Sequence, residues 1–225
     1  MSSHNKALTR RTNPKKIPIF PLNGAVMLPA CDLPLTIFEP RYLNMIDDAL
    51  KSDRLIGMIQ NEDGNLAQIG GLGRITQFVE QENGRYLIVL KGLKRFRIHS
   101  ELSVSTPYRQ ALVCFEDFEN DAELHTAKRD LDSISDTKRS ERATLILAMK
   151  ALAKRLNVEV DWDGLSQIPM PLLVNQTAMI SPFDPEDKQS LLEAITPDER
   201  RKLLTGLLHL YASKNMGQTA PKTKQ

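Results

Sequence analysis

The chain is poor in cysteine and has no long apolar run. Its 225 residues include two cysteines, Cys31 and Cys114, which are too few for a secreted disulfide scaffold and favour a reducing, cytoplasmic location. No run of about 18 apolar residues occurs, so no membrane-spanning helix is predicted, and residues 1–16 lack the apolar core of a secretory signal. Hydrophobic residues make up 41% and charged residues 26%, which is typical of a globular protein.

The chain also lacks the motifs of common catalytic sites. It has no G-x-x-x-x-G-K-[ST] phosphate loop and no G-x-S-x-G nucleophile elbow, and nothing next to Cys31 would activate its thiol. Gly70-Gly71-Leu72-Gly73 precedes a strand pattern, which predicts a bulge or bend. The histidines have no second ligand at metal-binding spacing: His4, His99, His125 and His209. We therefore expect no catalytic residue, no metal, no cofactor and no enzymatic activity.

Positive charge is concentrated at the two ends of the chain. Eight of the 30 Lys and Arg residues lie in residues 1–16 and 214–225, which contain no acid, so residues 17–213 hold 22 basic against 28 acidic residues. An acidic body does not favour a protein that grips phosphate backbones. The two basic ends are predicted to be disordered tails.

Residues 17–118 are predicted to form a β-rich subdomain with one helix at 42–50. Asn83-Gly84 predicts a type I′ hairpin, and Lys91–Lys94 predicts a turn into the following strand. The apolar or alternating runs that suit strands are 17–22, 33–38, 54–60, 74–80, 85–90, 95–100 and 108–115. Turn signals about every ten residues are typical of a small, mostly antiparallel barrel or sandwich.

Residues 119–213 are predicted to form about four helices. Residues 172–180 suit a buried helix, Asp184-Pro185 begins another, and Thr196-Pro197-Asp198-Glu199 is a capping box. An apolar stripe at helical spacing marks a further helix, with Leu145, Met149, Leu152 and Leu156. The predicted fold class is therefore α+β, with a β-rich subdomain followed by a helical bundle.

One basic cluster offers a nucleic-acid alternative. Its members lie on or next to predicted strands of the barrel: Arg85, Lys91, Lys94, Arg95 and Arg97. Cations and aromatic rings on one barrel face could track a nucleic-acid strand. However, Arg95 and Arg97 share one face of an alternating strand while Phe96 lies on the other, which favours a solvated outer face for the cations.

Several blocks of the sequence resemble one known family. Ile17-Pro-Ile-Phe-Pro-Leu22, Leu33-Pro-Leu-Thr-Ile-Phe-Glu-Pro-Arg-Tyr42 and Gly73-Arg74-Ile75 are similar to the N-terminal substrate-binding domain of the ATP-dependent protease Lon, here on its own. The resemblance runs from about residue 16 to about residue 212. It implies a small PUA-like pseudo-β-barrel followed by a helical bundle. In Lon an AAA+ ATPase and a Ser–Lys peptidase follow, and neither has a counterpart in these 225 residues, so a protease label does not carry over.

The resemblance implies an unfolded or extended polypeptide as the partner, and a separate Lon protease or a chaperone are further expected partners. No membrane partner is expected, because the chain has no long apolar run. Such binding needs an exposed apolar patch or an open sheet edge. The candidate residues are Met27, Leu33, Leu35, Phe38, Tyr42 and Met170. A structural interpretation competes for four positions: Phe38 and Tyr42 would belong to the core, and Glu39 and Arg41 would tie strand to helix.

Overall fold

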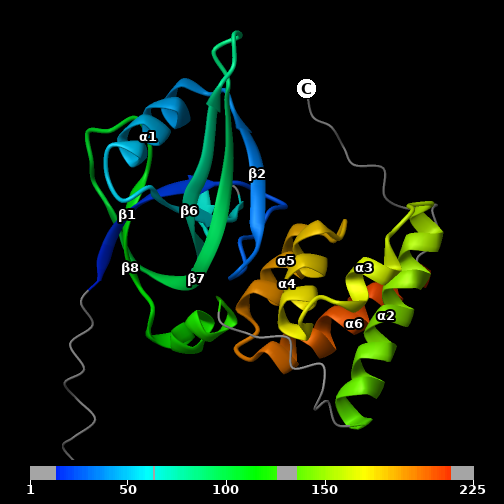
Figure 1. The fold of residues 1–225 in the computed structure, drawn as a ribbon. Coiled ribbons are helices and arrows are strands. Elements are labelled where there is room, and N and C mark those ends of the chain that lie inside the picture. Colours follow the sequence, from blue (N-terminus) through cyan, green and yellow to red (C-terminus); the bar gives the residue numbers. More distant parts are fainter. Residues whose placement is uncertain (1–13, 63, 126–135, 214–225) are drawn as a thin grey trace, which may run out of the picture.

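The computed structural model describes residues 14–62, 64–125 and 136–213, in which a curled sheet is followed by a helical region (Figure 1). The strands are β1 (Lys15–Pro21), β2 (Asp32–Ile37), β3 (Leu55–Ile59), β4 (Asn61–Glu62), β5 (Asn65–Leu66), β6 (Ile69–Glu80), β7 (Tyr86–Leu102) and β8 (Gln110–Cys114). The helices are α1 (Pro40–Leu50), the 3-10 segment η1 (Glu116–His125), α2 (Asp136–Leu156), α3 (Trp162–Ser166), α4 (Met170–Ile180), α5 (Pro185–Glu193) and α6 (Pro197–Ser213). The predictions for 1–13 and 214–225 lie outside the described residues, whereas Lys15 and Lys16 belong to β1 instead of a tail.

The large sheet closes on itself. Its strand order is β2-β7-β6-β3-β1-β8, and β7 also pairs with β8, so five strands form a barrel and β2 hangs on β7 as an edge strand. The β1–β3 pair is parallel and the other neighbours are antiparallel. The predicted α+β fold with a PUA-like pseudo-barrel is confirmed.

Two apolar clusters lie on the two faces of the sheet. One fills the barrel and includes Phe96, which is fully buried. The other lies between the sheet and α1, whose buried side chains are Tyr42, Met45, Ile46 and Ala49. These four positions share one helix face, so the apolar spacing of 42–50 was sufficient to predict α1.

The local predictions for the long β6–β7 hairpin need two corrections. Gly84 donates to the carbonyl of Gln81, and Gly84 rather than Asn83 has a positive φ, 74°, which is the pattern of a type I turn with a glycine bulge instead of a type I′ turn. No turn occurs at Lys91–Lys94, because β7 is one continuous strand of 17 residues. Its register against β6 shifts between Leu72 and Gly73, so the predicted bulge lies inside the ladder.

The described part of the helical region holds five α-helices, one more than predicted, because the short α3 was missed. The capping box is confirmed: the Thr196 N–H donates to Glu199 at 3.2 Å and the Glu199 N–H donates to Thr196 at 3.1 Å. Asp184 precedes α5, but its carboxylate accepts from the Tyr211 hydroxyl at 2.7 Å instead of capping the helix.

The barrel and the bundle share one apolar cluster. Val26, Leu28 and Ile69 of the barrel lie in the core formed by α2, α4, α5 and α6. Polar side chains add bonds across the same contact, with Lys188 donating to the carbonyl of Gly24 at 2.9 Å and Gln60 donating to that of Pro185 at 2.7 Å. The boundary predicted at residue 118 falls inside η1.

Candidate functional site

On one face of the strands β2, β7 and β6, none of the described helices packs. Side chains alternate along each strand, and Ile37, Ile88 and Ile75 point to the face that α1 covers. Residues in register with one another share a face, so the opposite face carries the row Thr36–Leu87–Val79 and the row Pro34–Val89–Gln77. Within the closed barrel this side of β6 and β7 faces the interior. Along the hairpin, beyond the closed part, the same side faces outward.

Large apolar side chains are exposed on this surface. Val79 is 57% and Leu87 is 41% exposed, and Phe38, which follows the buried Ile37, is 63% exposed. We call this surface the hairpin face and define it by Pro34, Phe38, Val79, Leu87 and Val89. Clustered apolar exposure on three adjacent strands is typical of an interaction site, whereas single exposed apolar residues are ordinary.

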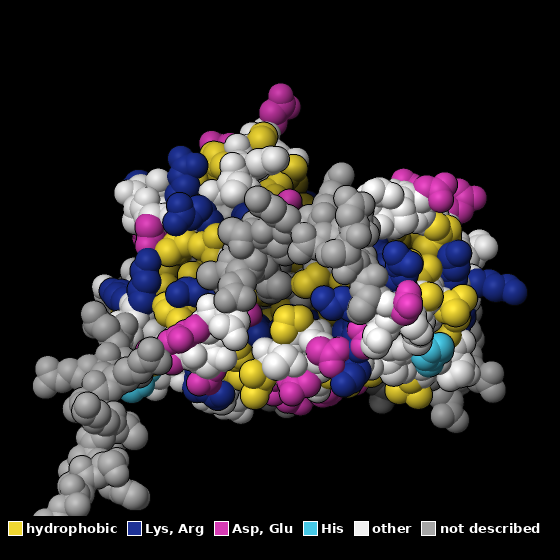
Figure 2. All heavy atoms as spheres, turned by 60° about the horizontal axis from the view of Figure 1, so that its bottom comes forward, with side chains coloured by type: hydrophobic (Ala, Val, Ile, Leu, Met, Phe, Trp, Pro, Cys, Tyr) yellow, Lys and Arg dark blue, Asp and Glu magenta, His cyan; other side chains and the backbone are white. Residues whose placement is uncertain are grey.

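Cations border the hairpin face. Arg85 stacks over the Phe38 ring at 5.8 Å, near the tip of the hairpin. Toward the barrel, Arg74, Lys91 and Asp32 form the next row of the sheet, in which Lys91 pairs with Asp32 at 3.2 Å. Figure 2 shows hydrophobic side chains beside Lys and Arg side chains over the barrel half of the molecule.

The structure corrects two of the apolar candidates. Met27 is 1% exposed, because the loop that carries it crosses the sheet at Gly71. Tyr42 is 7% exposed and packs edge-on against Phe20, with ring centroids 4.6 Å apart, which supports the structural interpretation of this residue. Neither side chain is accessible to a partner.

The other apolar candidates differ in exposure. Leu33 and Leu35 are half-buried against the α1 side of the sheet, and Met170 is half-buried against the bundle core. Phe38 remains exposed, so it does not occupy the core position that the structural interpretation gave it. Glu39 and Arg41 pair with each other at 2.7 Å.

The basic cluster does not form one surface, and Arg95 needs the main correction. Arg95 is 2% exposed, because the outside of the barrel is covered by η1 and the bundle at this point. The remaining cations lie apart. Arg97 pairs with Asp117 at 2.6 Å, and Lys94 stacks on the Phe115 ring at 3.8 Å. Nothing in this arrangement supports the nucleic-acid alternative.

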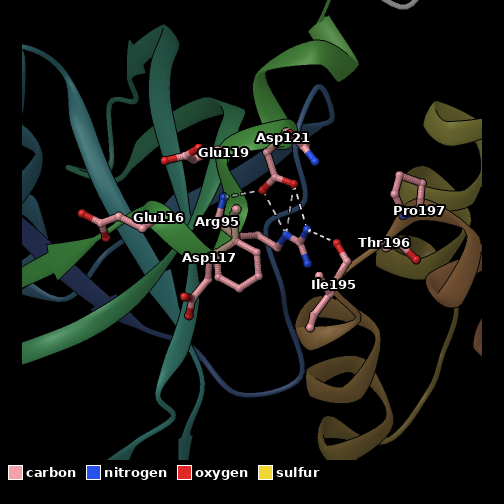
Figure 3. A pocket seen from close by; sticks show the side chains of 10 residues that line it. Arg95, Glu116, Asp117, Glu119, Asp121, Ile195, Thr196 and Pro197 are labelled. Carbon is pink, nitrogen blue, oxygen red and sulfur yellow. Dashed lines mark hydrogen bonds and ion pairs between the residues drawn. The ribbon is translucent and has the colours of Figure 1, made fainter. Parts of the chain in front are cut away.

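A cavity of about 230 Å³ lies between η1 and the start of α6 (Figure 3). Arg95 extends across its base, where its guanidinium bonds Asp121 at 2.8 Å and the carbonyl of Ile195 at 3.2 Å. The other lining residues are mostly acidic or apolar: Glu116, Asp117, Phe118, Glu119, Asn120, Thr196 and Pro197. Because the guanidinium of Arg95 donates to protein atoms of η1 and of the bundle, it joins barrel and bundle at this cavity and is not available to a ligand.

Arg200 extends the buried network around Arg95. The sequence pattern predicted a solvated outer face for Arg95 and did not single out Arg200. Arg200 is fully buried, and its guanidinium donates to Asn175 at 2.9 Å and to the carbonyl of Leu191 at 2.8 Å. Burial, and then the charge of Arg95, lower the pKa of Arg200 to about 9. The apolar stripe of α6 runs through Leu204, four residues after Arg200, so helical spacing already placed Arg200 on the inner face.

Among the side chains that the structure describes, those of residues 14–62, 64–121 and 136–213, no three from His, Cys, Asp or Glu come close enough to hold a metal ion. Among the described helices, none is long and apolar enough to span a bilayer. Cys31 is 2% exposed, and desolvation by burial raises the pKa of its thiol to about 12.

Cys31 is therefore expected to resist alkylation in the folded protein. Only the thiolate reacts, and a pKa of about 12 leaves little thiolate at pH 8. We expect iodoacetamide to modify Cys31 on the order of 100-fold more slowly than the half-buried Cys114, as measured by mass spectrometry of tryptic peptides. Full modification in urea is the control, and rapid modification of native Cys31 would contradict the prediction.

The closed barrel followed by a bundle is the fold of Lon N-terminal domains. A Lon N-terminal domain protein from Xanthomonas campestris aligns with a TM-score of 0.61 and 20% identity, covering 85% of this chain and 98% of that one. The N-terminal domain of the Mycobacterium avium complex Lon protease aligns with a TM-score of 0.63 and 18% identity, covering 86% and 98%.

Residues 16–209 match the model of the ATP-dependent protease La (LON) substrate-binding domain, and the chain belongs to this family. Lon protease 2 of Myxococcus xanthus is 28% identical over 207 residues, which cover 87% of this chain and 24% of that protein. The Lon protease of Anaeromyxobacter dehalogenans is 26% identical over 207 residues, with 87% and 23% covered. The chain thus spans about a quarter of the length of these relatives.

Proposed function

We propose that this chain is a non-catalytic module that binds unfolded or extended polypeptide segments through the hairpin face. The observation that carries the proposal is the apolar exposure of Phe38, Val79 and Leu87 on a sheet face that none of the described helices covers. Membership in a family whose description is substrate binding supports it. Burying these side chains against the apolar residues of a partner would supply the main driving force.

The cellular setting is part of the same proposal. Cys31 and Cys114 form no disulfide with each other, which suits a reducing cytoplasm. In that compartment the module would hold exposed segments for a separate Lon protease or a chaperone. Its own contribution would be binding without bond cleavage.

The double substitution Val79→Ser/Leu87→Ser tests the proposed site. Both side chains are exposed in the free protein, so the substitutions should preserve folding while removing apolar contact area. We expect the dissociation constant for a fluorescently labelled, reduced and unfolded model protein to rise at least about tenfold, as measured by anisotropy.

Leu147→Ser is the matched control, because Leu147 is 65% exposed on α2, in the bundle. It should leave the affinity unchanged. Absence of binding by the natural chain at ~100 μM, an affinity weaker than about −5.5 kcal/mol, would remove the proposed function. Equal losses in the two variants would remove the proposed site.

A further inference from the structure

The hairpin face has a positively charged side chain at each end, which a purely apolar patch would lack. Arg74 lies in the row at its barrel end and Arg85 lies at its tip. Among the described residues neither arginine takes part in an ion pair, whereas the neighbouring Lys91 is paired with Asp32. The apolar rows are thus bracketed by two guanidiniums without a carboxylate partner.

Carboxylates of the sheet do not compensate these charges. Asp32 lies in the same row as Arg74, but its carboxylate forms an ion pair with Lys91. Glu80 pairs in register with Tyr86, whose ring packs on the α1 side, so strand alternation directs Glu80 away from the hairpin face. The surface therefore combines aliphatic area with net positive charge, although the body of the chain is acidic overall.

The spacing of the two arginines sets the length of a matching ligand. Arg85 lies one residue before β7, and Lys91, the residue of β7 opposite Arg74, lies six positions further on. At about 3.3 Å per residue, the two ends of the face are roughly 20 Å apart. An extended segment of about six residues spans that distance.

We propose that the hairpin face selects extended segments in which about six mostly apolar residues are flanked by carboxylates, bound by Arg74 and Arg85. This inference rests on the proposed function and specifies its ligand. Arginine forms bidentate hydrogen bonds with carboxylates, which favour acidic over neutral or basic flanks. Because both guanidiniums are exposed, each pair contributes at most about fivefold in affinity, and the apolar contacts supply the rest.

The segment would lie across the face instead of adding a strand to the edge. β2 is one open edge of the sheet, but Pro34 lies in its middle, and proline on an edge strand hinders regular pairing with an added strand. The other is β6 beyond Arg74, where β3 no longer pairs with it. The rows on the face are also mainly aliphatic, with Leu87, Val79 and Val89, which suits apolar side chains better than stacked bases.

Three labelled peptides with one apolar six-residue core test the selection, with flanks of Glu, Gln or Lys. We expect the Glu peptide to bind about tenfold more tightly than the Gln peptide in anisotropy titrations at low salt, and the Lys peptide to bind most weakly. Raising NaCl to ~0.5 M should reduce the difference between Glu and Gln flanks. In the variant Arg74→Gln/Arg85→Gln this difference should disappear while the affinity for the Gln peptide stays the same.

The variant Arg139→Gln/Lys154→Gln changes the charge equally at exposed positions of α2 and should keep the preference for Glu flanks. Equal binding of all three peptides would overturn the selection and leave the proposed function in place. Binding of the unfolded model protein without binding of any peptide would also overturn the selection. If the unfolded model protein itself does not bind the natural chain, the proposed function is wrong. A single-stranded RNA that displaces the Glu peptide at low salt would point to a nucleic-acid partner and also overturn the inference.

Discussion

The substitution Arg95→Ala is expected to lower the free energy of unfolding by about 3–5 kcal/mol. Its guanidinium is 2% exposed and bonds Asp121 on η1 at 2.8 Å. It also donates to the carbonyl of Leu192 at 2.9 Å, at the end of α5. Removing it takes the guanidinium donors from a buried carboxylate, which keeps the backbone N–H of position 95 at 2.8 Å, and from the buried carbonyl of Leu192, and each lost bond leaves desolvation energy uncompensated. Urea denaturation followed by circular dichroism measures the change.

Arg97→Ala is the matched control in the same strand. Arg97 pairs with Asp117 at 2.6 Å, but both side chains are 48% exposed, so its loss should cost less than about 1 kcal/mol. Asp121→Asn should approach the effect of Arg95→Ala, because it leaves Arg95 and Arg200 buried without a carboxylate. Similar midpoints for Arg95→Ala and Arg97→Ala would show that the buried pair does not hold barrel and bundle together.

The substitution Gly71→Ala is expected to destabilise the barrel by about 3 kcal/mol or more, because an added methyl group has no space. A Cβ at Gly71 would lie 2.0 Å from the carbonyl oxygen of Met27, and one at Gly92 would lie 2.1 Å from that of Leu28. Both obstacles are backbone atoms of the loop that crosses the sheet. Either that loop or the β6–β7 ladder must shift, and Gly92→Ala should therefore behave similarly.

Gly206→Ala provides the opposite control. A Cβ at Gly206 meets nothing within 4 Å, and the residue lies inside α6. Alanine is the better helix former, so this variant should gain about 0.5–1 kcal/mol. Thermal unfolding of the three variants side by side tests the set. An unchanged melting temperature for Gly71→Ala would show that the loop moves at little cost.

The elements with clear local signals could be predicted from the sequence. Periodicity located α1, the capping box located the start of α6, and the alternation around Phe96 correctly separated barrel interior from exterior. The change from strand patterns to helix patterns also gave the order of the β-rich subdomain and the bundle, and the family resemblance added the PUA-like type of the barrel. The prediction that the barrel exterior around Arg95 is exposed to solvent was wrong. Alternation says which way Arg95 points but does not say that η1 and α5 cover that side.

The hairpin face could not be located in advance for a similar reason. Phe78-Val79 and Leu87-Ile88-Val89-Leu90 are apolar at consecutive positions, which is typical of strands with apolar residues on both faces. Of the helices in the described part of the chain, α1 packs on one face of that part of the sheet, and apolar side chains on the other face stay exposed. The sequence motif around Phe38 drew attention to β2, whereas the accessible residues lie mostly on β6 and β7.

The unbroken course of β7 has a mechanical consequence. Its first half carries Leu87 and Val89, and its second half carries Arg95, which is bonded to the bundle. A pull on a polypeptide segment bound near the hairpin tip would load β7 along its length. The hydrogen bonds of β7 to β2 and β8 would then be strained together in shear instead of opening one by one. In this way β7 would transmit force from a bound polypeptide segment to the helical bundle.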